Sequence, residues 1–190
     1  MEDIKETNND IPENDIYNLD PIVATSKQKY PYRSAAFYVA VGSFIMTALS
    51  ILICILTGFL SNGITTRTWE RCVYIVFGAV LIFFAYVLFS KAKNDSKIEN
   101  AVIHCRLITD GVYAYVRNPM DTAVLFVNAA VLFFYGNVYL YSLLFIYWIA
   151  FTIVLKKTEE LWLRKEFGKD YAIYYDSVGR LIPLKPGSRK

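Results

Sequence analysis

The sequence contains little of the chemistry that metal sites and disulfide scaffolds need. Its 190 residues include one histidine, His104, and three cysteines, Cys54, Cys72 and Cys105, in no spacing typical of a metal site or a disulfide framework. Internal repeats, a glycine-rich phosphate-binding loop and a Ser-His-Asp set are also missing. We therefore expect no bound metal, and we exclude a multi-histidine metal enzyme and a small disulfide-bonded fold.

Charged side chains are absent from three long stretches. No Asp, Glu, Lys or Arg occurs in residues 34–66, 72–90 or 122–155, and 55% of the chain is hydrophobic. A helix of roughly 20 apolar residues crosses the ~30 Å hydrocarbon layer of a membrane. The first two stretches therefore predict transmembrane helices at about residues 35–60 and 73–89.

The third stretch is too long for one ordinary crossing, because 34 residues of helix would extend about 51 Å. It contains Gly136-Asn137, a dipeptide typical of turns. We predict two helices, 119–135 and 138–155, joined by a tight turn. A single long tilted helix is the alternative.

The fold class that follows is an all-α integral membrane protein with about four transmembrane helices and a C-terminal cytoplasmic helical segment. With four spans, Lys and Arg gather on the side that holds both termini and the 91–121 loop, whereas only Arg67 and Arg71 fall on the other side. Basic residues stay on the cytoplasmic side. We therefore predict a multi-pass protein with both termini in the cytoplasm, and we favour a bacterial inner membrane over the endoplasmic reticulum.

The net charge of +3 hides two regions of opposite sign. Residues 1–20 hold seven acidic residues and one basic residue, and the rest of the chain carries a net +9. We interpret residues 1–30 as an acidic disordered tail without a cleavable signal peptide, and residues 31–190 as the membrane domain. Membrane lipids are the expected partners, and no nucleic-acid partner is expected.

Two polar segments flank the predicted hairpin, 107–121 before it and 158–183 after it, so the hairpin should bring them to one membrane face. In the second, we expect the last span to continue as a helix with a Glu160–Arg164 pair and to end at Gly168. A short helix would then present Tyr171, Tyr174 and Tyr175. Their spacing alone indicates that Glu159 and Glu160 lie on a solvated helix face.

These two segments resemble the isoprenylcysteine carboxyl methyltransferase and phospholipid methyltransferase superfamily, whose members are membrane enzymes that use S-adenosylmethionine. The family pattern is roughly Gly-Pro-Tyr-x-x-Val-Arg-His-Pro-Met-Tyr-x-Gly, a helical hairpin, and then Glu-Glu-x-x-Leu-x-x-x-Phe-Gly-x-x-Tyr-x-x-Tyr-x-x-x-Val-x-Arg-x-Ile-Pro. The matching residues are Gly111, Tyr113, Val116, Arg117, Pro119 and Met120, followed by Glu159, Glu160, Leu163, Phe167, Gly168, Tyr171, Tyr174, Val178, Arg180, Ile182 and Pro183. The resemblance covers about residues 75–185.

The resemblance implies a methyltransferase with S-adenosylmethionine as cofactor and a lipophilic acceptor from the bilayer, of the isoprenylcysteine carboxylate or phospholipid amine type. It places the cofactor region at 107–183. Arg117 and Glu160 are the implied catalytic residues. The implied cofactor-binding residues are Tyr115, Arg117, Asn118, Pro119, Glu159, Glu160, Tyr171 and Tyr174.

Four positions depart from the family pattern. Val112 stands where the family has proline, Asn118 where it has histidine, Asp121 where it has tyrosine, and Ala123 where it has glycine. Asn118 and Asp121 also suit a helix start, with Asn118 as N-cap before Pro119. The departures favour one alternative, a methyltransferase fold without activity. A second alternative is an NADPH-dependent membrane reductase, because the C-terminal segment also resembles that of the steroid reductases.

Overall fold

The computed structural model describes residues 33–94 and 107–182, and in these ranges the chain is helical without a β-strand. The predicted acidic tail, residues 1–30, lies outside them, as do His104, Cys105 and Pro183. The α-helices are α2 (Arg33–Thr57), α3 (Thr68–Asn94), α5 (Pro119–Tyr135), α6 (Ser142–Lys157) and α7 (Glu159–Ser177). Short 3-10 turns are η2 (Ser61–Gly63), η3 (Gly111–Ala114) and η4 (Val138–Tyr141).

Three segments are long and apolar enough to cross a membrane: Ala35–Thr57, Thr68–Lys93 and Val138–Lys157. The fourth apolar helix, Pro119–Tyr135, has 17 residues. Its length of about 26 Å lies at the lower limit for a crossing. The prediction of an all-α membrane protein is confirmed.

The predicted turn at Gly136-Asn137 is confirmed, and the alternative of a single long helix is wrong. Gly136 ends α5 in the left-handed conformation, at φ 73°, and its backbone N–H bonds the Leu132 carbonyl oxygen. Glycine adopts this conformation without the steric cost that a Cβ atom adds. Asn137 is fully buried, and its side-chain amide donates to the Leu60 carbonyl oxygen over 3.0 Å.

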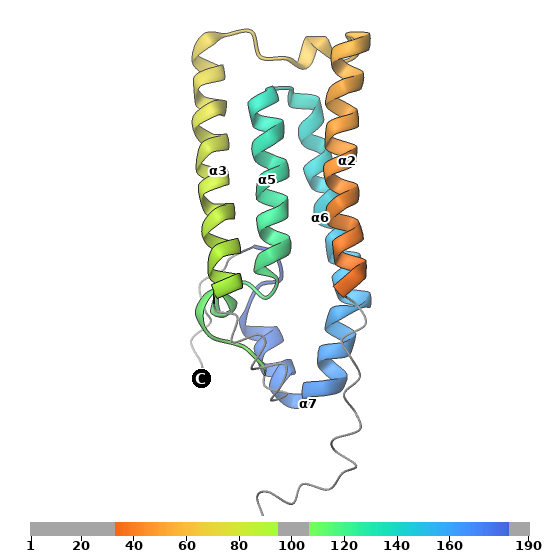
Figure 1. Cartoon of the computed structure of the whole chain (residues 1–190), viewed down its shortest axis with the longest axis vertical. Helices are drawn as coiled ribbons and strands as arrows, with labels where there is room; N and C mark the ends of the chain where they lie inside the picture. The colour runs from red at the N-terminus through yellow and green to blue at the C-terminus, as the bar shows by residue number, and fades with distance from the viewer. Residues whose placement is uncertain (1–32, 95–106, 183–190) are drawn as a thin grey trace, which may run out of the picture. The chain divides into compact units, whose positions relative to one another are not determined.

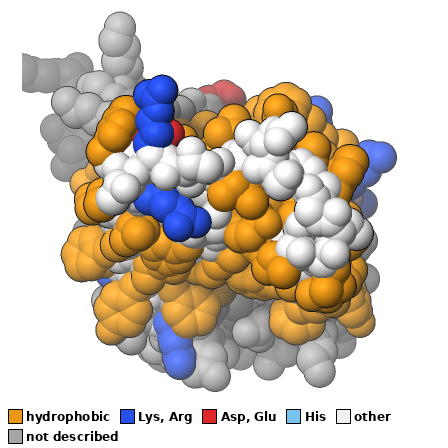
Figure 2. All heavy atoms as spheres, turned by 90° about the horizontal axis from the view of Figure 1, so that it is seen from above, with side chains coloured by type: hydrophobic (Ala, Val, Ile, Leu, Met, Phe, Trp, Pro, Cys, Tyr) orange, Lys and Arg blue, Asp and Glu red, His pale blue; other side chains and the backbone are white. Residues whose placement is uncertain are grey.

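The four apolar helices run in alternating directions (Figure 1), so the start of α2, the end of α3, the start of α5 and the end of α6 share one end with α7. Helix α5 packs against α3, α2 and α6. Figure 2 views the opposite end, where hydrophobic side chains lie among backbone and polar side-chain atoms and a few basic side chains. Asn62, Thr65 and Thr66 belong to the polar residues of this end.

A buried polar network joins α2 to the α5–α6 hairpin. Thr47 donates to the Asn128 side-chain oxygen over 2.8 Å and lies 3.0 Å from the Tyr147 hydroxyl. The Asn128 amide nitrogen donates to Ser43 over 3.1 Å and to the Val124 carbonyl over 3.0 Å. Such hydrogen bonds, together with packing, hold helices together in hydrocarbon, where the hydrophobic effect does not act between helices.

Helix α6 does not continue into the C-terminal segment as we predicted. It ends at Lys157, and α7 begins at Glu159 after a break at Thr158, whose φ of −115° and ψ of −77° lie at the edge of the helical region. The second predicted break is confirmed, because Gly168 interrupts α7 with φ 48° and ψ −117°. These two breaks turn the chain back toward the start of α5 (Figure 1).

Candidate functional site

Two segments far apart in the sequence pair through their backbones at the α7 end. The Arg117 N–H donates to the Gly179 carbonyl over 2.9 Å, and the Asn118 N–H donates to the Arg180 carbonyl over 3.1 Å. Val116 and Gly179 form a parallel bridge. The prediction that the hairpin brings these segments together is therefore confirmed.

Side chains reinforce this pairing from both sides. The Tyr174 hydroxyl donates to the Tyr113 carbonyl over 2.7 Å, which ties α7 to η3. The Thr122 hydroxyl lies 3.0 Å from the Leu181 carbonyl oxygen, which ties α5 to the segment after α7. Thr122 is fully buried and Leu181 nearly so. The site is thus built on a connection between α5, η3 and α7.

Glu160 lies at the centre of a buried charge cluster that also contains Arg117 and Arg180. Arg180 binds its carboxylate with two parallel hydrogen bonds, Nε to Oε1 at 2.6 Å and Nη2 to Oε2 at 2.8 Å. Arg117 Nη1 lies 3.3 Å from Oε1. Glu160 is only 3% exposed. The interpretation of Glu160 as part of a solvated face is therefore wrong, and so is the predicted Glu160–Arg164 pair.

Arg117 is buried with part of its hydrogen-bonding capacity unused. Its side chain is 8% exposed. Nε has no hydrogen-bond partner among the described residues, and Nη1 has only the 3.3 Å ion pair with Glu160. Its guanidinium stacks 4.0 Å above the centre of the Tyr175 ring, which Arg164 also approaches, at 4.5 Å. Buried N–H donors without acceptors are costly, so this guanidinium is suited to bind an anionic group.

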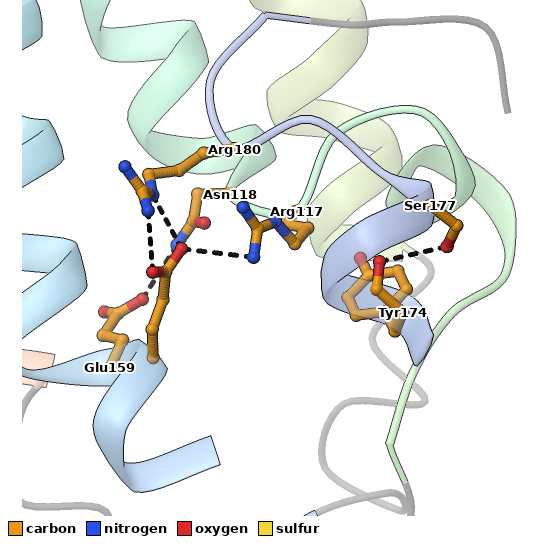
Figure 3. A network of polar contacts seen from close by, with 7 residues as sticks. Arg117, Asn118, Glu159, Tyr174, Ser177 and Arg180 are labelled. Atoms are coloured by element: carbon orange, nitrogen blue, oxygen red, sulfur yellow. Dashed lines mark hydrogen bonds and ion pairs between the residues drawn. The ribbon is translucent and has the colours of Figure 1, made fainter. Parts of the chain in front are cut away.

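Asn118 takes the N-cap position of α5 as predicted, but its side chain makes no capping hydrogen bond. Its amide nitrogen donates instead to Glu159 Oε2 over 2.9 Å. Figure 3 shows Asn118, Arg117 and Arg180 approaching the start of α7. Asp121 interacts with the same Asn118 side chain and repels Glu159. Asn118 therefore lies between two carboxylates.

The predicted tyrosines divide into buried and exposed ones. Tyr171 is 1% exposed and interacts with Arg117, and burial together with the Glu160 carboxylate raises its pKa to about 12. Burial also raises the pKa of Tyr174. Both hydroxyls are therefore protonated at neutral pH. Tyr115, in contrast, is 53% exposed and does not share this buried environment.

The site also contains Arg180 and Tyr175, which were not among the site residues predicted from the sequence. Both Glu160 oxygens bind Arg180, and the hydrogen bond to Glu160 raises the pKa of Arg180. Arg180 was visible as a matched residue of the family pattern, although nothing in the spacing connected it to Glu160. Pro119 is buried at the first turn of α5, where it shapes the helix start.

Metal-ligating side chains do not gather anywhere in residues 33–94 and 107–182, where no group of three or more His, Cys, Asp or Glu could hold an ion. Of the cysteines in these ranges, Cys54 is buried and Cys72 exposed, and both are free thiols. The chemistry available at the site therefore comes from guanidinium, carboxylate, amide and phenol groups.

Comparison with known proteins assigns the chain to a family without providing a close relative. No curated protein and no solved structure matches it. The phospholipid methyltransferase family matches residues 73–170, which include most of α3, the α5–α6 hairpin, Arg117 and the Glu159-Glu160 pair. The match covers more than half of the chain, and it agrees with the resemblance found in the sequence. The protein therefore belongs to the phospholipid methyltransferase family of membrane methyltransferases.

Proposed function

We propose that this protein transfers a methyl group from S-adenosylmethionine to a lipophilic acceptor at the membrane. The observation that carries this proposal is the buried Arg117 guanidinium inside a methyltransferase family match. Its Nε lacks a hydrogen-bond partner in the described chain, and its Nη1 contacts only Glu160 Oε1, at 3.3 Å. The cofactor carries a carboxylate, and a guanidinium binds carboxylates through paired, charge-assisted hydrogen bonds. The residues present therefore fit this cofactor.

The bound cofactor would supply an activated methyl group on a sulfonium. Arg117 would hold the carboxylate, and the buried rings of Tyr171 and Tyr174 would border the sulfonium or the adenine. Methyl transfer needs little covalent assistance from the protein, because positioning and electrostatics account for most of the acceleration.

The two adjacent glutamates have different surroundings, which favours different roles. Glu160 already binds Arg180 through both oxygens and Arg117 through one of them. Glu159 is only partly buried and binds the Asn118 amide. We therefore assign contact with the cofactor's hydroxyl or amino groups to Glu159, and we assign to Glu160 the task of fixing Arg117.

A lipophilic acceptor, either an isoprenylcysteine carboxylate or a phospholipid amine, is supported by an apolar hollow between the helices. The hollow has a volume of about 250 Å³ and lies between α2, α3 and α5. Its walls include Phe44, Tyr86, Phe89 and Val127, and it begins one turn after the start of α5, at Ala123. Such a surface suits a hydrocarbon chain.

We place the site on the cytoplasmic side of a membrane, with a bacterial inner membrane favoured. The α7 end carries the exposed basic residues Lys91, Lys93, Lys156 and Lys157, while Arg67 and Arg71 lie at the opposite end. The excess of basic residues marks the cytoplasmic side. S-adenosylmethionine is available in that compartment.

Thermal unfolding in detergent with S-adenosylhomocysteine, the demethylated cofactor, tests cofactor binding. A ligand that binds only the folded state raises the melting temperature. At a hundredfold excess over Kd, it adds about 2.7 kcal/mol to the free energy of unfolding. We expect a shift for the wild type and for Lys165→Gln, an exposed control, and a much smaller shift for Arg117→Gln. The proposal is wrong if millimolar ligand leaves the wild type unshifted, or if Arg117→Gln shifts as much.

An inactive methyltransferase fold is the second candidate, favoured by Asn118, Asp121 and Ala123 at positions where the family pattern differs. The Asn118 amide is held by Glu159, and an amide cannot titrate near neutral pH as histidine does. Under this alternative, Asn118→His with Asp121→Tyr would create cofactor binding that the wild type lacks. Methyl transfer from labelled cofactor to lipid by the wild type would exclude it.

A further inference from the structure

We propose that Arg180 is a positioning residue that holds Arg117 in its ligand-binding orientation through Glu160, a carboxylate that both arginines bind. This inference rests on the proposed function, in which Arg117 binds the carboxylate of the cofactor. Arg180 matches the family pattern seen in the sequence, but it lies beyond residues 73–170, where the family comparison matches. The role proposed here rests on its contacts in this structure.

The geometry gives the two arginines unequal shares of one carboxylate. Arg180 uses the two-pronged form, at 2.6 Å and 2.8 Å, and so fixes the plane of the Glu160 carboxylate. Arg117 reaches only Oε1, through Nη1 at 3.3 Å. Oε1 is the atom that both guanidiniums share. A rotation of the Glu160 carboxylate would therefore move the negative charge that faces Arg117.

Burial makes this dependence strong. The side chains of Arg117, Glu160 and Arg180 are 8%, 5% and 17% exposed. Two cations share one anion here, so the cluster carries an excess positive charge in surroundings that solvate it poorly. An anion bound by Arg117 would complete the balance. Arg180 keeps the Glu160 carboxylate occupied. Without Arg180, Glu160 would pair with Arg117 alone, and the Arg117 guanidinium would no longer be available to bind an anionic ligand.

The backbone holds Arg180 in register with Arg117. The Asn118 N–H donates to the Arg180 carbonyl, and the Arg117 N–H donates to the carbonyl of the preceding residue, Gly179. The next residue, Leu181, is buried in a cluster with Ala36, Phe151 and Leu155. Arg180 is thus anchored on both sides, as a residue that fixes another side chain must be.

A double-mutant cycle on the affinity for S-adenosylhomocysteine distinguishes positioning from direct binding or general stability. Full-length protein in detergent would be titrated as wild type, Arg180→Gln, Arg117→Gln and the double variant, with Lys165→Gln as a surface control. We expect Arg180→Gln to raise Kd about tenfold or more in the wild-type background. In the Arg117→Gln background it should leave Kd unchanged, because Arg180 acts only through Arg117.

Arg180→Lys is a milder substitution that tests whether a change in Kd reflects positioning or a loss of folding. Lysine keeps the charge without the planar two-pronged contact, so we expect an intermediate Kd with a ligand-free melting temperature close to that of the wild type. The inference is overturned if Arg180→Gln or Arg180→Lys binds as the wild type does, or if their losses are the same with and without Arg117. A wild type that binds no S-adenosylhomocysteine would instead contradict the proposed function, and this inference would be rejected with it.

Discussion

The Asn118 side-chain amide donates a hydrogen bond to the Glu159 carboxylate over 2.9 Å, across 41 positions of sequence. Asn118 precedes α5 and Glu159 begins α7, so this bond joins the start of one helix to the start of another. The asparagine therefore acts as a donor between elements, while its own helix lacks a side-chain cap.

Asn118→Asp separates these two roles. Aspartate caps helices about as well as asparagine, so a pure cap would tolerate the change. At this site, however, the new carboxylate would face Glu159 without a proton to donate, and Asp121 lies close by. We expect a loss of about 1–3 kcal/mol of unfolding free energy at pH 7.5, measured in detergent. The loss should shrink below about pH 5, where carboxylates take up protons; Asn62→Asp, at an exposed position, should show neither effect.

Glu160→Gln should strongly destabilise the protein. It removes the carboxylate that contacts both Arg117 and Arg180 and leaves two buried cations without their shared anion. Breaking a buried ion pair on one side costs about 3–5 kcal/mol. Thermal unfolding should show this loss, and Glu166→Gln on the exposed face of α7 should change the stability by no more than about 0.5 kcal/mol. Equal effects of the two substitutions would contradict the buried cluster.

Gly168→Ala should destabilise α7, although alanine normally favours helices. At φ 48° and ψ −117°, Gly168 adopts a conformation that is costly for any residue with a Cβ atom, by about 1–3 kcal/mol. Gly42→Ala in α2 is the matched control, because a Cβ atom there meets no other atom within 4 Å. We expect the control to keep or raise the melting temperature. A neutral Gly168→Ala would mean that α7 is continuous.

Asn128→Leu should loosen α2 from the hairpin. The substitution removes hydrogen bonds to Ser43 and Thr47 within the membrane domain, where such bonds contribute about 0.6–2 kcal/mol. Unfolding by denaturing detergent should begin at a lower concentration. Thr57→Val removes a hydroxyl that donates to the Ile53 carbonyl and accepts from the Phe59 N–H. Both contacts are local to the end of α2, so this substitution should have a smaller effect.

Cysteine labelling tests the sidedness of the membrane domain. In a cysteine-free background, an impermeant maleimide should label Thr66→Cys in intact cells, because this exposed position lies at the end opposite α7. Lys165→Cys, exposed on α7, should react only after permeabilisation. The reverse pattern would place the site outside the cytoplasm.

Much of the fold was predictable because hydrophobicity and turn chemistry act locally. Residues 34–66 carry no charge, and α2 occupies most of that stretch. Gly136-Asn137 predicted the turn because glycine tolerates positive φ, and the turn lies there. The break at Thr158 was missed, because no glycine or proline marks it and the return of α7 to the site imposes it.

The apolar helices, the hairpin and the family follow from residue types at short separations. The partners of the polar residues depend instead on contacts made in the folded chain. Glu160 binds Arg180 and Arg117 instead of Arg164, one turn away, because α7 turns inward and buries the carboxylate where an unpaired charge is too costly. Likewise, Asn118 donates to Glu159 because the chain brings two helix starts together, a proximity that no local spacing encodes.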